Sequence, residues 1–226
     1  DGQVSTLEGM KNFYRVESIY IRPGDLVTLE ALYGLNDLQY LALLNNSQWE
    51  FKRFEALRFF MNLRYLGVDL ANAVSADFIP LEALPRLKEL GIGSAITWNS
   101  IEFLRELPRL RFLYLGVPQV DFSPLQSLHY LADFRLYAPA LNDIKLLGDI
   151  PNLQWLGIEA KSLTSLDGLE RYPGLQHLEI KHSSISDVSK LAELTNLQNF
   201  WLRDNQIETV FGRMPQLKPN GILDLT

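Results

Sequence analysis

Cysteine is absent from the 226-residue sequence. Its absence excludes disulfides, thiolate nucleophiles and cysteine-based zinc sites, although it leaves the cellular compartment open. The sequence also lacks any apolar run that approaches about 18 residues, so we expect no insertion into a membrane. Lys and Arg total 21 against 27 Asp and Glu, which gives a net charge of -6 without any basic block. Because binding to phosphate backbones rests on clustered Lys and Arg, the sequence argues against a nucleic-acid partner.

Motifs of the common enzyme classes are missing as well. The stretch GIGS at 91–94 has the opening glycines of a phosphate-binding loop but not the residues that should follow. Neither a G-x-S-x-G nucleophile motif nor an H-E-x-x-H metal motif occurs. We therefore predict that the chain is not an enzyme and has no catalytic residues, no cofactor and no metal site.

Two pairs of polar residues are the weak candidates for chemistry. His177 and Glu179 alternate on a predicted strand and should share one face, where an imidazole beside a carboxylate is able to bind a metal or move a proton. Two ligands do not make a site, so an ordinary solvated face is the preferred interpretation. The second pair consists of two carboxylates on nearby predicted strands, Asp133 and Glu159. Arg135 and Lys181 should lie on the same face, so we expect these cations to balance the negative charge of the carboxylates.

An apolar pattern, L-x-x-L-x-x-L-x-L, recurs along the whole chain. Its copies start 20 to 25 residues apart, with a mean of about 22, and such regular self-similarity indicates a solenoid of repeats. The copies start at Phe13, Leu35, Phe60, Leu84, Leu107, Leu128, Ile150, Tyr172, Leu194 and Met214.

Each repeat combines two kinds of spacing. Apolar and variable residues alternate at the end of the pattern, as in LYL at 113–115, which predicts a short strand with one buried face. The apolar residues that follow are three apart, as in Leu163, Leu166 and Leu169, which fits one or two turns of α-helix or 3₁₀ helix. Because one unit cannot bury its own apolar face, neighbouring units must stack around a continuous core.

The clearest copies are LTNLQNFWLRDNQIETV at 194–210, YPGLQHLEIKHSSISDVSKLAEL at 172–194 and the turn VDFSPLQSL at 120–128. On these stretches the chain resembles the leucine-rich repeat family, in the 22-residue class of bacterial internalins and the phosphatase-regulating leucine-rich repeat protein. The resemblance implies an α/β solenoid of about ten repeats. It implies a curved parallel sheet on the concave face and short helical or 3₁₀ segments on the convex face. The family's asparagine in the turn after the strand is present only as Asn46 and Asn205.

We expect a single leucine-rich repeat array over residues 1–226. Residues 1–12 should form a partial repeat or cap, residues 13–213 nine repeats, and residues 214–226 a partial last repeat. Solenoids usually need polar caps, and neither end shows an obvious one, so we expect a fragment of a longer protein or ends shielded by degenerate repeats. The first residue is Asp, which suggests a processed or excised chain. A bacterial secreted or cell-surface location is slightly favoured over a cytoplasmic one.

The variable residues beside the central strand leucine should point to solvent on the concave face. Seven of the eighteen such residues in the first nine repeats are Phe, Tyr or Trp, whereas the average aromatic content of 11% predicts about two. Lateral stacking between strands explains part of this excess, and partner recognition is the preferred explanation. The expected partner-binding residues are Tyr20, Tyr40, Tyr65, Phe112, Tyr114, Arg135, Tyr137, Trp155, Glu159, His177, Glu179, Trp201 and Arg203.

The sequence thus predicts a module that binds a protein or peptide on its concave face. Glycines such as Gly67, Gly91 and Gly157 should leave shallow depressions between the aromatic side chains, where a partner is able to approach the backbone closely. Two alternatives stay open. One is the recognition domain of a larger enzyme or effector, of ligase type or phosphatase-regulating. The other is a carbohydrate-binding surface protein that stacks sugars on the aromatic rings. The sequence predicts neither the partner's identity nor the oligomeric state.

Overall fold

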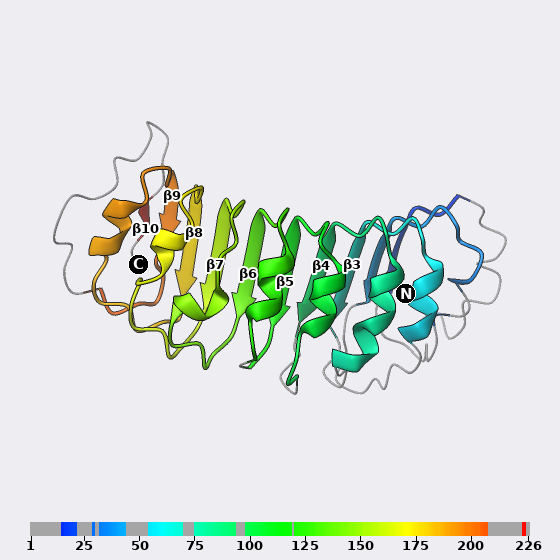
Figure 1. Cartoon of the computed structure of the whole chain (residues 1–226), viewed down its shortest axis with the longest axis horizontal. Helices are drawn as coiled ribbons and strands as arrows, with labels where there is room; N and C mark the ends of the chain where they lie inside the picture. The colour runs from blue at the N-terminus through cyan, green and yellow to red at the C-terminus, as the bar shows by residue number, and fades with distance from the viewer. Residues whose placement is uncertain are drawn as a thin grey trace, which may run out of the picture.

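One parallel sheet runs through the whole solenoid. The computed structural model describes residues 15–21, 29, 32–43, 54–69, 75–93, 98–118, 120–207 and 223–224. Within them, every strand pairs with the next strand of the sequence, and Figure 1 shows the strands side by side along the molecule. The strands are β1 Ser18–Ile21, β2 Tyr40–Leu43, β3 Tyr65–Asp69, β4 Glu89–Gly93, β5 Phe112–Gly116, β6 Asp133–Tyr137, β7 Trp155–Glu159, β8 His177–Lys181, β9 Asn199–Trp201 and β10 Leu223–Asp224.

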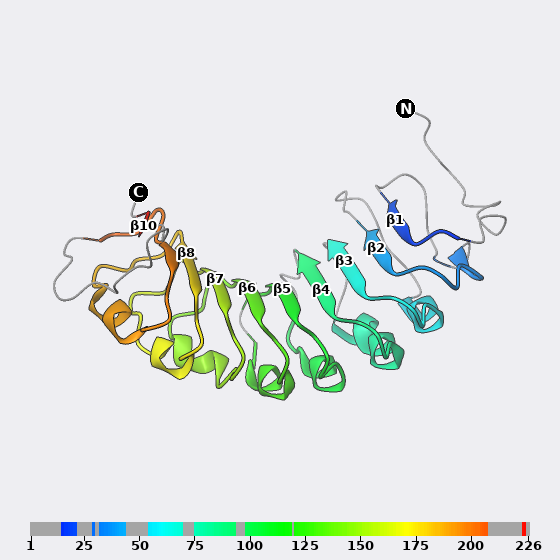
Figure 2. The ribbon, with the colours of Figure 1, turned by 90° about the horizontal axis from the view of Figure 1, so that it is seen from above.

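The segments between the strands contain short 3₁₀ helices. Their apolar residues are three apart, and a 3₁₀ helix makes one turn every three residues, so these side chains share one buried face. Figure 2 shows the helices on the outer side of an arc and the strands on its inner side, which confirms the predicted curved solenoid. The described helices are η3 Phe54–Phe59, η4 Ser75–Ala83, η5 Glu102–Glu106, η6 Ser123–Ser127, η7 Ile144–Leu147, η8 Leu169–Arg171 and η9 Ser189–Glu193.

The repeated leucines form one continuous core between the sheet and the helices. In one repeat, Leu107, Leu110, Leu113 and Leu115 are all buried. Each fully buried leucine contributes about 2 kcal/mol relative to an exposed one. Tyr114 lies between two of these leucines on β5, so its side chain faces the concave side instead. The core therefore determines which side chains the concave face presents.

Backbone hydrogen bonds join the repeats at the start of each strand. The N–H groups of Arg64 and Tyr65 both donate to the carbonyl of Gln39, at 2.8 and 3.0 Å. In the next repeat, the N–H groups of Lys88 and Glu89 donate in the same way to the carbonyl of Arg64, at 2.9 and 3.0 Å. Equivalent residues of neighbouring repeats are thereby held in line at this edge of the sheet.

Asparagine side chains also link neighbouring repeats. Asn62, Asn152 and Asn196 each donate to a backbone carbonyl of the preceding repeat, at 2.6 to 2.8 Å. In the turn after β9, Asn205 donates to two backbone carbonyls, both at 2.9 Å, as its resemblance to the family's turn asparagine implies. Asn46, the other expected turn asparagine, lies outside the described residues.

On the convex side, two aspartates close the turns before helices. Asp121 accepts hydrogen bonds from the N–H and the hydroxyl of Ser123, both at 2.9 Å. Asp187 accepts the same pair from Ser189, at 2.8 and 3.0 Å. The backbone hydrogen bonds hold the pKa of both carboxyls below the ordinary value for aspartate. This is the convex turn that the stretch VDFSPLQSL predicted.

The predicted end segments fall mainly outside the described residues. None of residues 1–12 is described, and residues 214–226 are described only at β10, which pairs in parallel with β9. No helix in the described part of the chain is long and apolar enough to cross a membrane.

Candidate binding surface

The strands present their outward side chains in register across the concave face. The first outward positions form one row, and the third positions form a second row. The first row is Ser18, Tyr40, Tyr65, Glu89, Phe112, Asp133, Trp155, His177 and Asn199. The second row is Tyr20, Ala42, Gly67, Gly91, Tyr114, Arg135, Gly157, Glu179 and Trp201.

Three tyrosines stack across β1, β2 and β3. The rings of Tyr40 and Tyr65 are parallel, with centroids 3.9 Å apart, and Tyr20 tilts against Tyr40 at 4.9 Å. Partial burial, together with a hydrogen bond to Tyr65, raises the pKa of the Tyr40 hydroxyl. The Tyr65 hydroxyl lies over Gly67, where an added Cβ would be only 2.7 Å from it. Because Gly67 has no side chain, the Tyr65 ring has room to lie parallel to the Tyr40 ring.

Arg135 on β6 lies between two aromatic rings. Its guanidinium carbon is 5.4 Å from the centroid of Phe112 and 5.1 Å from the centroid of Trp155, within the range of cation–π attraction. Asp133 holds the same guanidinium through two hydrogen bonds of 3.1 Å. The predicted charge balancing of Asp133 by Arg135 is thus confirmed.

Trp155 is also the centre of a second aromatic group. It stacks on His177, with centroids 4.8 Å apart, and on Trp201 at 5.5 Å. Nδ1 of His177 is 2.9 Å from the side-chain nitrogen of Asn199, which fits donation by the amide to an unprotonated Nδ1. Burial lowers the pKa of His177, while Asp133 acts in the opposite direction. Both the contact with Asn199 and the lowered pKa favour the neutral form of His177 in this stack.

The structure does not bring His177 and Glu179 together as an acid–base or metal pair. Glu179 instead pairs with Lys181, at 2.7 Å, and His177 faces Asn199 and Trp155. Within the described ranges, no group of three His, Cys, Asp or Glu residues is arranged to hold a metal ion. The polar residues of β8 thus interact with their neighbours on the sheet.

A hollow of about 200 Å³ lies in the concave face over β5 to β8. Gly157 contributes no side chain to it, while Tyr114 and Tyr137 line one side and are 36% and 37% exposed. Partial burial raises the pKa of the Tyr114 hydroxyl, and the charges of Glu159 and Asp69 raise it further. The remaining lining residues mix both charges with apolar atoms: Arg135, Leu136, Ile158, Glu159, Glu179 and Lys181.

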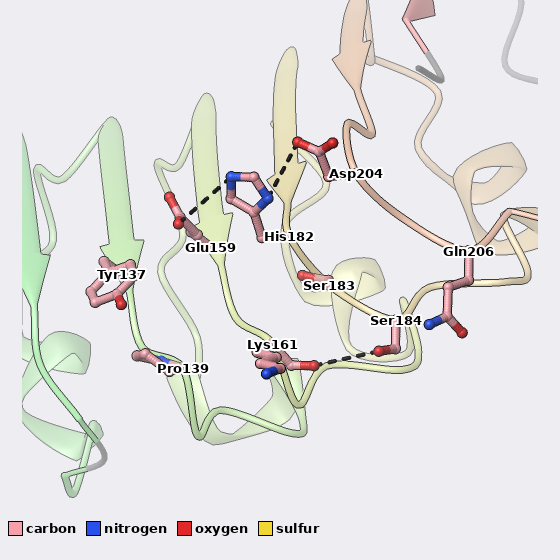
Figure 3. A pocket seen from close by; sticks show the side chains of 9 residues that line it. All are labelled: Tyr137, Pro139, Glu159, Lys161, His182, Ser183, Ser184, Asp204 and Gln206. Atoms are coloured by element: carbon pink, nitrogen blue, oxygen red, sulfur yellow. Dashed lines mark hydrogen bonds and ion pairs between the residues drawn. The ribbon is translucent and has the colours of Figure 1, made fainter.

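A second hollow of about 400 Å³ adjoins the first, at the edge where the strands end. Figure 3 shows His182 there between two carboxylates, with Nδ1 3.2 Å from Asp204 and Nε2 4.0 Å from Glu159. His182 and Asp204 both have positive φ, at 49° and 54°, in the turns that follow β8 and β9. Tyr137 and Glu159 line both hollows, so the two form one continuous surface.

Comparisons with known proteins identify the fold. No family model matches the chain, and no curated protein matches its sequence. The crystal structure of an internalin C2 from Listeria monocytogenes is similar, with a TM-score of 0.58 and 24% identity over 80% of this chain and 76% of that one. A second Listeria monocytogenes internalin has a TM-score of 0.58 at 19% identity, over 91% of this chain and 65% of that one. The chain has the leucine-rich repeat fold.

The structure sorts the sequence-predicted residues by what their side chains contact. Most of the predicted aromatic residues contact one another or Arg135. Lateral stacking between strands therefore accounts for much of the excess of aromatic residues on the concave face. Tyr20, Tyr114 and Tyr137 are the predicted aromatics with the greatest exposure, Tyr20 at 64%. Arg203 follows β9, and its carbonyl accepts a hydrogen bond from the N–H of His182 at 3.2 Å.

Two side chains of the edge hollow, His182 and Asp204, were not predicted from the sequence. His182 follows β8 directly and Asp204 lies in the turn after β9. Each precedes the position where the family places its turn asparagine, which is Ser183 in one repeat and Asn205 in the next. The sequence signal that could have indicated them is a polar residue at this turn position in two successive repeats. The apolar alternation that predicted the concave residues covers the strands and not the turns that follow them.

Proposed function

We propose that the concave face binds a protein or a peptide, with Tyr114 and Tyr137 as its main aromatic contacts. The observation that carries the proposal is the hollow over Gly157, which two exposed tyrosines and several charged side chains line. Tyrosine supplies a large contact area with a polar end, and such residues are enriched in the centres of protein interfaces. The similarity to internalins supports the scaffold on which such a surface stands.

The scaffold favours binding because the surface is already ordered. Arg135 is fixed between two rings and by Asp133, and Glu179 is fixed by Lys181. Side chains that are held in this way lose little conformational entropy when a partner binds. Charged residues around the tyrosines then select partners by complementarity of charge rather than by adding much affinity.

The experiment uses the double variant Tyr114→Ala/Tyr137→Ala and a phage library that displays random peptides and small folded domains. Binders selected on the wild-type chain should bind this variant about tenfold more weakly or worse, because the substitutions remove two aromatic contacts from the middle of the surface. Biolayer interferometry of individual binders gives the dissociation constants.

The matched control is Tyr33→Ala/Tyr130→Ala, which removes two exposed tyrosines that lie outside the concave strands. This control should keep the wild-type dissociation constants within about twofold, since it leaves the contacts at the hollow intact. Equal losses in both double variants, or none in either, would contradict the proposal. Thermal unfolding of both variants separates lost contacts from lost structure.

A further inference from the structure

Five basic side chains gather at one corner of the solenoid, where β3, β4 and β5 begin. We refer to them together as the basic corner. All five are exposed, and they come from three consecutive repeats. The basic corner consists of Arg64, Arg86, Lys88, Arg109 and Arg111.

The repeat spacing brings these residues together although the sequence keeps them apart. Arg64, Lys88 and Arg111 occupy the same position in successive repeats, 24 and 23 residues apart. The Lys88 N–H donates to the Arg64 carbonyl at 2.9 Å, and the Arg111 N–H to the Lys88 carbonyl at 2.7 Å. Adjacent strands lie about 4.8 Å apart, so the three cations stand in one short row.

The other two arginines form a second row beside the first. The guanidinium of Arg86 donates to the side-chain oxygen of Asn62 at 2.7 Å, and that of Arg109 donates to the carbonyl of Pro85 at 3.0 Å. Each hydrogen bond reaches back to the preceding repeat and uses one nitrogen of the guanidinium. Because a guanidinium carries five N–H donors, most donors of Arg86 and Arg109 stay available to a partner.

The charges of the basic corner are not balanced within the described residues. Arg105, Arg135 and Arg171 each pair with a carboxylate, whereas the described residues contain no ion pair for any member of the basic corner. Glu89 follows Lys88 directly but forms no ion pair with the described residues. Cations at this spacing repel one another, and carboxylates of a partner would relieve that repulsion. The chain carries this local excess of positive charge although its net charge is -6.

We propose that the basic corner docks an acidic segment of the partner protein, rich in Asp and Glu. This inference rests on the proposed function only in taking the partner to be a protein. The corner adjoins the first concave row at Tyr65, Glu89 and Phe112, so one partner is able to contact both surfaces. The planar fork of arginine matches a carboxylate with two parallel hydrogen bonds, and four of the five cations are arginines.

The extent of the corner favours a short acidic segment over a long polyanion. In the repeat before it, the position equivalent to Arg86 is Asp37, and in the repeat after it the two positions are Tyr130 and Ala132. A nucleic acid or a sulfated polysaccharide that continued along the row would meet Asp37 at one end and no cation at the other. A short stretch of carboxylates ends within the three repeats that carry the positive charge.

Fluorescence anisotropy tests the inference with a fluorescein-labelled peptide of Glu and Asp, and with a neutral peptide of Gln and Asn. The acidic peptide should bind the wild-type chain at low salt and be released as the salt concentration rises toward about 0.5 M. Lys88→Gln/Arg111→Gln should weaken its binding about tenfold, because two of the row's three cations lose their charge. The neutral peptide should not bind.

The matched control is Arg58→Gln/Lys145→Gln, which removes the same charge from η3 and η7 on the convex side. It should keep the wild-type affinity for the acidic peptide within about twofold, since these exposed charges lie on the helices rather than at the starts of the strands and are screened by salt. Equal weakening by the two variants, or no binding of the acidic peptide, overturns the inference. So does tighter binding of oligothymidylate or a heparin oligosaccharide that Lys88→Gln/Arg111→Gln abolishes.

The concave-face variant Tyr114→Ala/Tyr137→Ala separates this inference from the proposed function. It should bind the acidic peptide as the wild type does, because the corner does not include these tyrosines. If the acidic peptide fails to bind while library binders still depend on the two tyrosines, the docking inference falls and the proposed function stands. If the acidic peptide binds while library binders do not depend on the two tyrosines, the docking inference stands and the proposed function of the concave face falls.

Discussion

The two halves of the concave face use aromatic residues differently. Over β1 to β3, Tyr20, Tyr40 and Tyr65 stack on one another beside small residues. Over β5 to β9, Trp155 also stacks on His177 and Trp201, but Tyr114 and Tyr137 line a hollow among charged side chains and form no ring contact in the described structure. The excess of aromatic residues therefore has two different explanations within one sheet. Stacked rings stabilise the neighbouring strands, whereas the exposed rings beside the hollow are the ones that we propose as partner contacts.

The largest stability difference between the halves should come from Tyr40→Ala. Tyr40 is the middle ring of the tyrosine stack, and its loss removes both ring contacts together with their buried area. We expect the free energy of unfolding to fall by about 2 kcal/mol, since each ring pair contributes about 1 kcal/mol beyond burial. Tyr114→Ala should cost less than about 0.5 kcal/mol, as a substitution of an exposed residue away from such contacts. Urea unfolding followed by circular dichroism measures both.

Tyr20→Ala is the control for the stacking argument, because Tyr20 contacts only one side of the stack and is 64% exposed. Its effect should lie between those of the other two variants. If Tyr40→Ala and Tyr114→Ala destabilised the chain equally, the distinction between tyrosines that stack and tyrosines that line the hollow would be wrong.

A smaller effect should separate the two glycines beneath the aromatic residues. In Gly67→Ala the new Cβ would lie 2.7 Å from the Tyr65 hydroxyl and displace that ring from its stack. In Gly157→Ala the closest contact is 3.5 Å, to the Arg135 side chain, which is an ordinary van der Waals distance. We expect a loss of about 1 kcal/mol for the first variant and less than about 0.5 kcal/mol for the second. Parallel urea titrations compare them, and a larger loss for Gly157→Ala would contradict the comparison.

The leucine spacing was enough to predict the solenoid and the direction of the strand side chains. Leucines at alternate positions must enter the core, so the residue between them, such as Tyr114, has to face the concave side. The leucine pattern did not predict which neighbouring side chains that residue contacts. Tyr65 and Tyr114 occupy similar strands, yet one ring stacks on Tyr40 and the other lines a hollow. Their difference depends on which neighbouring residues are glycines and on whether the adjacent strand carries a tyrosine in register, as β2 does for Tyr65.

Groups that form across repeats were the main features that the sequence did not reveal. Arg64, Lys88 and Arg111 never form a basic run, because each pair is separated by a whole repeat. His182 and Asp204 face each other in the same way, across 22 residues. Alignment of the repeats in columns, followed by reading down each column, would have found both groups. Charge counted along the chain does not show them, since a solenoid places its neighbours about 22 residues apart.

The smallest effect should be a different response of the two halves to pH. The pKa of His177 is lowered by burial, so the folded chain resists protonation more than the unfolded chain does. The resulting stability is present above the ordinary histidine value of about 6.5 and is lost as the pH falls through the lowered pKa. His177 lies on β8, in the second half of the solenoid. Mild acid should therefore loosen β7 to β9, with a change in tryptophan fluorescence, and His177→Gln should reduce this response.

The tyrosine stack should respond at the opposite end of the pH scale. The pKa of Tyr40 is raised, so the folded state keeps the proton that the unfolded state releases above the ordinary value of about 10. Its contribution to stability is complete below that value and is lost as the pH rises through the raised pKa. Hydrogen exchange measured by mass spectrometry at mildly acidic and at alkaline pH resolves the two halves. If acid loosened β1 to β3 as much as β7 to β9, the pH response would not follow from these side chains.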